Sequence, residues 1–221
     1  MYREKLDAAV KEILKDEPTG HDIHHSTRVY NLAKEIAKNE NWQIDDDILF
    51  AIAMLHDAGH ERSISTGDTY RYKHMIYSAD IAKRVLAEVG FPEQKIPVVL
   101  QGILQHDQTK PWGLASRTPT DIKEILLIQD ADNLEAIGML GMVRVLVFNI
   151  QAGTPLYKPE LSLTKDLEKS RLESSIHNLI WHLSLDDNLN TQAAKQMAQE
   201  RKVQAKNFIE QFLKEWNGRT D

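Results

Sequence analysis

The feature that most constrains this chain is a histidine followed by an aspartate, His56-Asp57, at the end of the apolar run 48–55. The residues three, four and seven positions before His56 are apolar, so a helix over this run would point His56 toward the core. Asp57 would follow about 100 degrees further round, at the last turn. Burying an ionised carboxylate is costly unless a cation compensates it, and histidine with aspartate is an ordinary ligand pair for a divalent metal. The pair therefore predicts a metal site, provided that other segments supply further ligands.

Apolar residues recur at helical spacing along most of the chain, and the alternation typical of strands is absent. The fold class predicted is all-α, a single globular helical bundle that forms one domain over residues 1–221. A second helix should open at residues 21–25, and the helix near 138–150 is so apolar that we expect it to be central. The other expected helices cover residues 3–16, 45–58, 72–89, 93–107, 119–137, 165–185 and 190–216.

Composition excludes several kinds of protein. The chain has no cysteine, which rules out disulfides, thiolate nucleophiles and cysteine-ligated zinc. A net charge of −6 makes a nucleic-acid partner unlikely, although a local pocket could still bind a small phosphate compound. The charged N-terminus does not resemble a signal peptide, and no run has the length of a membrane span. We therefore expect a cytoplasmic protein without a membrane partner.

Histidine or aspartate occupies the core-facing positions of five expected helices. A single histidine on such a face is usually a hydrogen-bonded core residue. Two carboxylates in the same interior need a positive charge, and Arg144 is the one basic residue on these faces. A metal centre satisfies this need, and a sulfur-free donor set suits Mn, Fe, Co, Ni, Zn or Mg. The residues concerned are His25, His56, Asp57, His74, His106 and Asp132.

Three motifs carry a resemblance to a known family. Residues 25–29 (His-Ser-Thr-Arg-Val), 53–57 (Ala-Met-Leu-His-Asp) and 129–138 resemble, in order, the three motifs of the HD-domain metal-dependent phosphohydrolases. The resemblance implies a helical fold of the HD-domain type. It also implies a divalent ion held by His25, His56, Asp57 and Asp132. In the third motif, both the resemblance and the helical pattern favour Asp132 over Asp130.

The downstream residues are similar to a bacterial subgroup of small HD hydrolases, some of which cleave nucleoside triphosphates. The similarity covers residues 141–144, 191–194, 200–201 and Phe208. One departure is His182, where that subgroup commonly has a lysine. If that lysine contacts phosphate, the replacement weakens the case for a triphosphate substrate.

The resemblance leaves two roles open for His74 and His106. In HD proteins with two metals, histidines on the helices after the His-Asp pair bind a second ion. In members with one metal, polar residues of this region contact substrate instead. The number of ions is therefore one or two.

Further candidates each have a structural alternative. His60 and Glu61 follow Asp57 by about one turn and could act as general acid or base, or could lie at the surface. Arg28 and Arg144 could bind phosphate through two hydrogen bonds, or could form ion pairs.

Four other residues are expected to have lesser roles. His21 and His24 are expected in a loop or at the surface, with a supporting bond to the site left open. Lys110 and Trp112 could shape the mouth of a pocket or belong to an ordinary loop.

The function predicted is that of an enzyme, a metal-dependent phosphohydrolase that acts on a nucleotide or another small phosphate ester by metal-activated water. Two alternatives stay open: a di-iron oxygenase of the same fold, and a nucleotide-binding sensor module without turnover. The expected partner is a small-molecule phosphate substrate. A homo-oligomer is also left open, because the last helices could pair with another chain.

Overall fold

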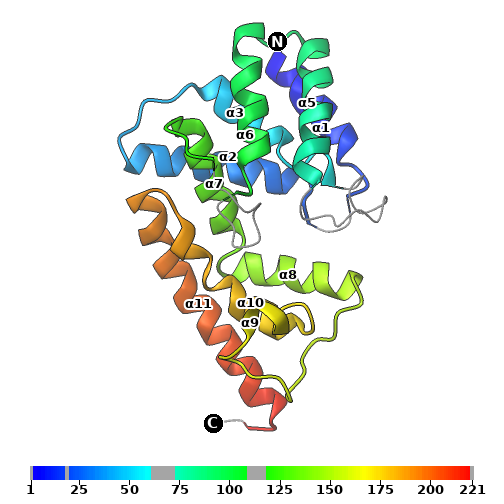
Figure 1. Cartoon of the computed structure of the whole chain (residues 1–221), viewed down its shortest axis with the longest axis vertical. Coiled ribbons are helices and arrows are strands. Elements are labelled where there is room, and N and C mark those ends of the chain that lie inside the picture. Colours follow the sequence, from blue (N-terminus) through cyan, green and yellow to red (C-terminus); the bar gives the residue numbers. More distant parts are fainter. Residues whose placement is uncertain (1, 18–19, 61–72, 109–117, 220–221) are drawn as a thin grey trace. The chain divides into compact units, whose positions relative to one another are not determined.

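The computed structural model describes residues 2–17, 20–60, 73–108 and 118–219, and every regular element within these ranges is a helix (Figure 1). The predicted all-α class is confirmed. The described residues form two compact units, Met1–Asp132 and Asn133–Asp221. The single domain expected over residues 1–221 stays a prediction.

The first unit contains most of the helices that bear the candidate site residues. Its helices are α1 (Tyr2–Ile13), α2 (Ile23–Asn39), α3 (Asp46–Leu55), α5 (His74–Val89), the short η1 (Glu93–Lys95), α6 (Ile96–Gln105) and the greater part of α7 (Lys123–Glu135).

Helix α3 is the centre of this unit, since it packs against α1, α2, α5 and α6. The side chain of Asp45 caps its start by accepting hydrogen bonds from the backbone N–H groups of Asp47 and Ile48. Leu49 and all residues from Ala51 to Leu55 are buried. The fully buried last turn of α3 places the residues that follow it inside the protein.

The turn after α3 lies directly on α5. The backbone N–H of Gly59 donates a hydrogen bond to Ser78 Oγ at 2.9 Å. A Cβ atom on Gly59 would lie only 2.4 Å from the backbone nitrogen of Ser78. This close approach requires glycine and determines the position of the His56-Asp57 turn relative to α5.

The second unit has its own core between α8 (Met139–Gln151), α10 (Ser175–His182) and α11 (Gln192–Trp216). The buried side chains of this core are Met142, Val145, Ile176, Leu179, Ala205 and Ile209. Two short helices, α9 (Leu167–Ser170) and η2 (Leu185–Asn188), complete the unit.

Two expectations about this part of the chain are wrong. No continuous helix covers 165–185, because Ser174 is extended and the next two backbone N–H groups donate to Pro155 and Leu156 instead of to a preceding turn. Helix α8 is not buried on all sides: Val143 and Ile150 are more than half exposed. Only the opposite face of α8 contributes to the core with α10 and α11.

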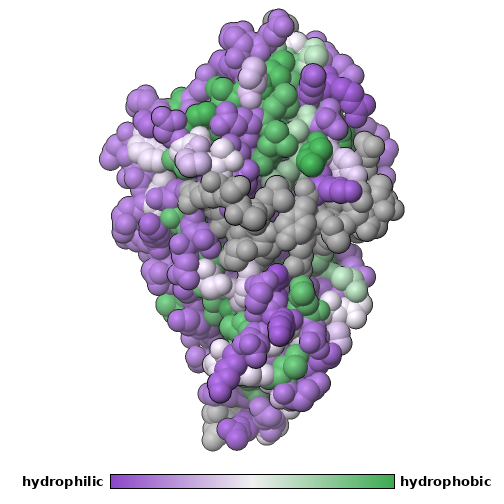
Figure 2. Space-filling model, in the orientation of Figure 1, coloured by the Kyte–Doolittle hydropathy of each residue, from purple (hydrophilic) through white to green (hydrophobic). Residues whose placement is uncertain are grey.

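The face drawn in Figure 2 is largely hydrophilic, apart from a group of apolar residues in its upper part and smaller apolar areas elsewhere. Within the described ranges, no single helix has the length and apolar composition needed to span a membrane. Helices α7 and α8 meet that test only when taken together across the bend between them.

Candidate metal centre

The structure brings together side chains from five helical segments of the first unit. His25 lies in the first turn of α2, and His56 and Asp57 directly follow α3. His74 begins α5, His106 directly follows α6, and Asp132 lies in α7. Each of the six is at most 6% exposed.

One group of ligand atoms surrounds a point between α2, α3 and α7. The Nε2 atoms of His25 and His56 are 3.2 Å apart. Oδ2 of Asp57 lies 3.4 Å from His25 Nε2 and 3.3 Å from His56 Nε2. Oδ1 of Asp132 lies 3.5 Å from His25 Nε2. Metal bonds of about 2.0–2.2 Å place neighbouring ligands of one ion about 2.8–3.6 Å apart, so these separations fit a shared ion.

A second group has the same spacing. The Nε2 atoms of His74 and His106 are also 3.2 Å apart. Oδ1 of Asp57 lies 3.6 Å from His74 Nε2 and 3.5 Å from His106 Nε2. Asp57 thus directs one carboxylate oxygen at each histidine pair, so it could serve as a ligand at either position.

The backbone selects which ring nitrogen of two histidines is available. Nδ1 of His56 lies 2.7 Å from the carbonyl oxygen of Ala53, and Nδ1 of His106 lies 2.7 Å from that of Ile103. A carbonyl oxygen can only accept, so Nδ1 carries the proton and donates in both cases. In the neutral ring Nε2 then keeps its lone pair for a ligand. Both residues have the same backbone angles, φ −58° and ψ −35°, at the end of their helices.

The electrostatics of the group favour positive charge. Burial lowers the pKa of His56, but the adjacent Asp57 carboxylate outweighs this and raises it to about 9. For the Asp57 carboxyl, burial raises the pKa, but His56 and the other imidazoles outweigh burial and hold the pKa well below its ordinary value. Burial lowers the pKa of His74 to about 4, so that ring is neutral at pH 7. At pH 7 the metal-free centre therefore combines an ionised Asp57, a neutral His74 and a protonated His56, whose Nε2 proton a metal ion would displace.

Sequence reasoning missed two acidic residues next to this centre. Asp107 is 3% exposed, and its ligand atoms lie within 4.8 Å of those of His106 and Asp132. A signal for it was present, because His106-Asp107 repeats the His-Asp pair at the end of an apolar helix. Glu17, which lies with His21 and His60, had no such signal.

The remaining candidates are placed as follows. His60 is 4% exposed, and its ring centroid lies 5.9 Å from that of His74. Arg28 is half-buried on α2, and His24 is exposed. In the second unit, Arg144 Nη1 lies 3.5 Å from Oε2 of the buried Glu135. Glu61, Lys110 and Trp112 lie outside the described residues.

The class of protein follows from comparison with known families. The sequence pattern of the HD domain matches residues 22–137, a stretch that contains all six residues of the candidate centre. The chain belongs to the HD-domain superfamily of hydrolases, and the predicted resemblance is confirmed.

Relatives match along nearly the whole chain. The Bacillus subtilis protein YpgQ is 31% identical over 212 residues, which cover 96% of this chain and 90% of YpgQ. The crystal structure of YpgQ in complex with ADP has a TM-score of 0.69 at 26% identity, with 96% of this chain and 97% of that chain covered. An HD-superfamily hydrolase from Bacillus thuringiensis has a TM-score of 0.68 at 29% identity, with 97% and 96% covered.

Proposed function

We propose that this protein is a metal-dependent phosphohydrolase that acts on a nucleotide or another small phosphate ester, with two divalent ions in its centre. The observation that carries the proposal is the placement of the Asp57 carboxylate between two histidine pairs. His25, His56 and Asp132 would hold the first ion together with Asp57 Oδ2. His74 and His106 would hold the second together with Asp57 Oδ1.

The donor set supports a hard or borderline divalent metal. Imidazole nitrogen and carboxylate oxygen, without sulfur, suit Mn, Fe, Co, Ni, Zn or Mg. The contacts of 3.3–3.6 Å between the buried carboxylates and the imidazoles are longer than hydrogen bonds of about 2.7–3.2 Å. Ions at the two positions would account for these separations.

Such a pair of ions would supply a water of lowered pKa and would neutralise charge on a phosphoryl group. The chain's own residues hold the geometry. Asp57 sets the separation of the two positions, and the hydrogen bonds from His56 Nδ1 and His106 Nδ1 keep both rings from rotating. Asp107 lies beside His106 and Asp132, and its carboxylate would accept the proton of the attacking water.

A nucleotide is the favoured substrate class because the relative YpgQ crystallises with ADP. The position of Arg28, one turn after His25 on α2, is suitable for contacting a phosphate group. His182, where the subgroup has lysine, donates from Nδ1 to the carbonyl oxygen of Asn178 at 2.8 Å. This bond fixes the orientation of the ring.

The decisive experiment measures metal and turnover on the same preparation. The purified chain is stripped with a chelator, reloaded with each metal, and assayed for phosphate or pyrophosphate release from nucleoside mono-, di- and triphosphates. We expect release only in the reloaded protein. Equal release by the stripped protein, or by Asp57→Ala, would contradict the proposal. Nucleotide binding without release would favour the sensor module.

The two-position geometry also favours a second candidate, the di-iron oxygenase. A bridging carboxylate with two histidine pairs suits two irons as well as two ions for hydrolysis. Dioxygen uptake by the iron-loaded protein separates the two reactions, because phosphate ester hydrolysis consumes no oxygen. Uptake that accompanies loss of a substrate, with no phosphate released, would replace the first candidate by the second.

A further inference from the structure

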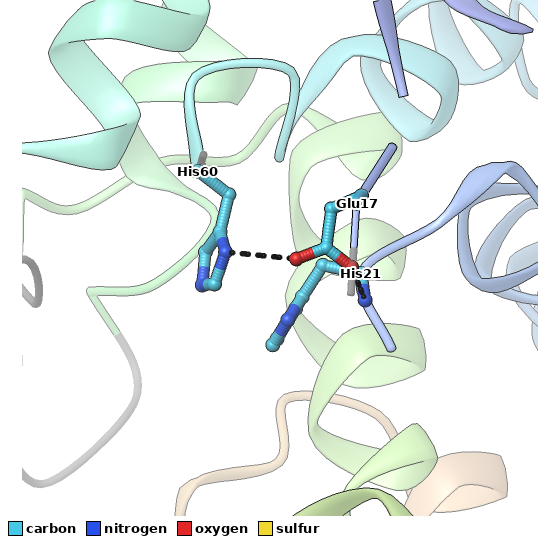
Figure 3. Close-up of side chains that lie close together, drawn as sticks. All are labelled: Glu17, His21 and His60. Carbon is cyan, nitrogen blue, oxygen red and sulfur yellow. Dashed lines mark hydrogen bonds and ion pairs between the residues drawn. The ribbon is translucent and has the colours of Figure 1, made fainter. Parts of the chain in front are cut away.

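A second cluster of ligand-type side chains lies beside the centre: Glu17, His21 and His60 (Figure 3). Glu17 follows the end of α1, His21 precedes α2, and His60 lies one turn beyond Asp57. The potential ligand atoms of the three residues all lie within 4.8 Å of one another. The six-residue centre uses none of them.

The carboxylate of Glu17 is nearly inaccessible, with only 1% of its side chain exposed. Oε2 accepts a hydrogen bond from the backbone N–H of His21 at 2.8 Å, which orients the carboxylate. Oε1 faces His60 Nδ1 at 3.6 Å (Figure 3). A carboxylate withdrawn from water to this extent requires compensation by positive charge or strong hydrogen bonds.

The distance from Glu17 to His60 is typical of two ligands of one cation. At 3.6 Å it exceeds the length of a hydrogen bond, about 2.7–3.2 Å. It equals the distance from Asp57 Oδ1 to His74 Nε2, across one of the positions proposed for an ion. A spacing of this size is expected between two ligands of one cation.

We infer that Glu17, His21 and His60 form a third divalent cation site. Two imidazoles and one carboxylate are a complete set for a metal with three protein ligands, and such a metal keeps open positions for water or a substrate oxygen. The rings of His21 and His60 are stacked, with centroids 3.9 Å apart, so one ring would turn to direct its nitrogen at the ion. The set contains no sulfur, so the same metals apply as in the centre. The site adjoins the centre on two sides, since the ring of His21 lies 5.6 Å from that of His25 and the ring of His60 lies 5.9 Å from that of His74.

The test counts manganese in the stripped full-length chain after equilibrium dialysis against Mn²⁺. We expect three ions per chain in the wild type and two in Glu17→Gln. Glu12→Gln is the matched control, because Glu12 is an exposed glutamate on α1 that pairs with Lys15. The control should bind three. An equal count in Glu17→Gln and the wild type would overturn the inference.

The same measurement separates this site from the centre. Asp57→Ala should lose two ions and keep the one at Glu17, so the two proposals fail independently. A crystal of the wild type soaked in Mn²⁺ gives a readout that needs no variant. We expect an anomalous difference peak about 2.0–2.2 Å from a ligand atom of each of the three residues. A map without that peak would also overturn the inference.

Discussion

The Nε2 atoms of His25 and His56 lie 3.2 Å apart, although 31 positions separate the two residues in the chain. His25 faces inward from the start of α2, and His56 from the end of α3. Asp57 then extends the cluster, because its two oxygens face different histidine pairs. The number of ions that the chain binds should therefore depend on this one carboxylate.

Replacing Asp57 by Asn should remove two ions per chain, because it takes a charged ligand from both positions. Phosphate release should fall to background. Asp80→Asn is the control, since Asp80 is an exposed carboxylate on α5. Elemental analysis of the two variants and the wild type checks the prediction. A variant at Asp57 that lost one ion only would exclude the bridging role.

Replacing His106 by Ala should remove a single ion, because this ring faces only one oxygen of Asp57. The ion at His25 and His56 should stay bound, with weaker turnover than in the wild type. The ratio of metal to protein distinguishes this outcome from the loss of two ions. Loss of both in His106→Ala would show that the positions are not separately occupied.

Gly59→Ala should destabilise the protein by about 1–3 kcal/mol, the usual cost of overpacking. The added Cβ would meet the backbone of Ser78 at 2.4 Å, and a helix backbone cannot move aside easily. Gly102→Ala is the comparison, because its Cβ would meet side-chain atoms of Ile52, the nearest being the terminal Cδ1 at 2.5 Å, and no backbone atom. Urea unfolding of both variants measures the difference. A smaller loss at Gly59 than at Gly102 would contradict the packing argument.

Asp47→Asn should reduce stability at neutral pH and make no difference in strong acid. Hydrogen bonds from Tyr2 and Lys95 hold the pKa of Asp47 below its ordinary value of about 4. A lowered pKa in the folded state stabilises the protein above the ordinary value, and this stabilisation is lost as pH falls through the folded value. Because the side chain is 27% exposed, the expected effect at pH 7 is about 1 kcal/mol or less. Melting temperatures of both proteins from pH 2 to 7 should converge at the acid end. A constant difference across that range would contradict the ion-pair explanation.

Arg144→Ala tests the two roles predicted for this residue. Glu135 is 3% exposed and faces Arg144, so loss of the guanidinium should cost about 1–3 kcal/mol in stability. Combining the change with Glu135→Gln should recover part of that loss, because the Glu135 carboxylate is then not left buried without the Arg144 guanidinium. Unfolding of the single and double variants measures the coupling. An unchanged stability with a raised KM would instead indicate a phosphate contact.

Much of the fold could be predicted because helical periodicity is a local property of each segment. The His-Asp pair marked the inward face at the end of α3, and the apolar spacing that includes Asp132 selected it over Asp130. Local patterns could not reveal that the chain breaks at Ser174. There the backbone N–H groups of the next two residues donate to Pro155 and Leu156, which are distant in sequence. Tertiary hydrogen bonds thus outweighed the helical pattern of 165–185.

The sequence by itself determined the helical class, the family and the residue types that point inward, because each depends on spacing within one segment or on short motifs. Only the tertiary structure decided which of these side chains meet. The division of Asp57 between two histidine pairs and the approach of Glu17 to His60 depend on how separate helices pack. No periodicity within a segment encodes the distance between atoms that belong to different segments.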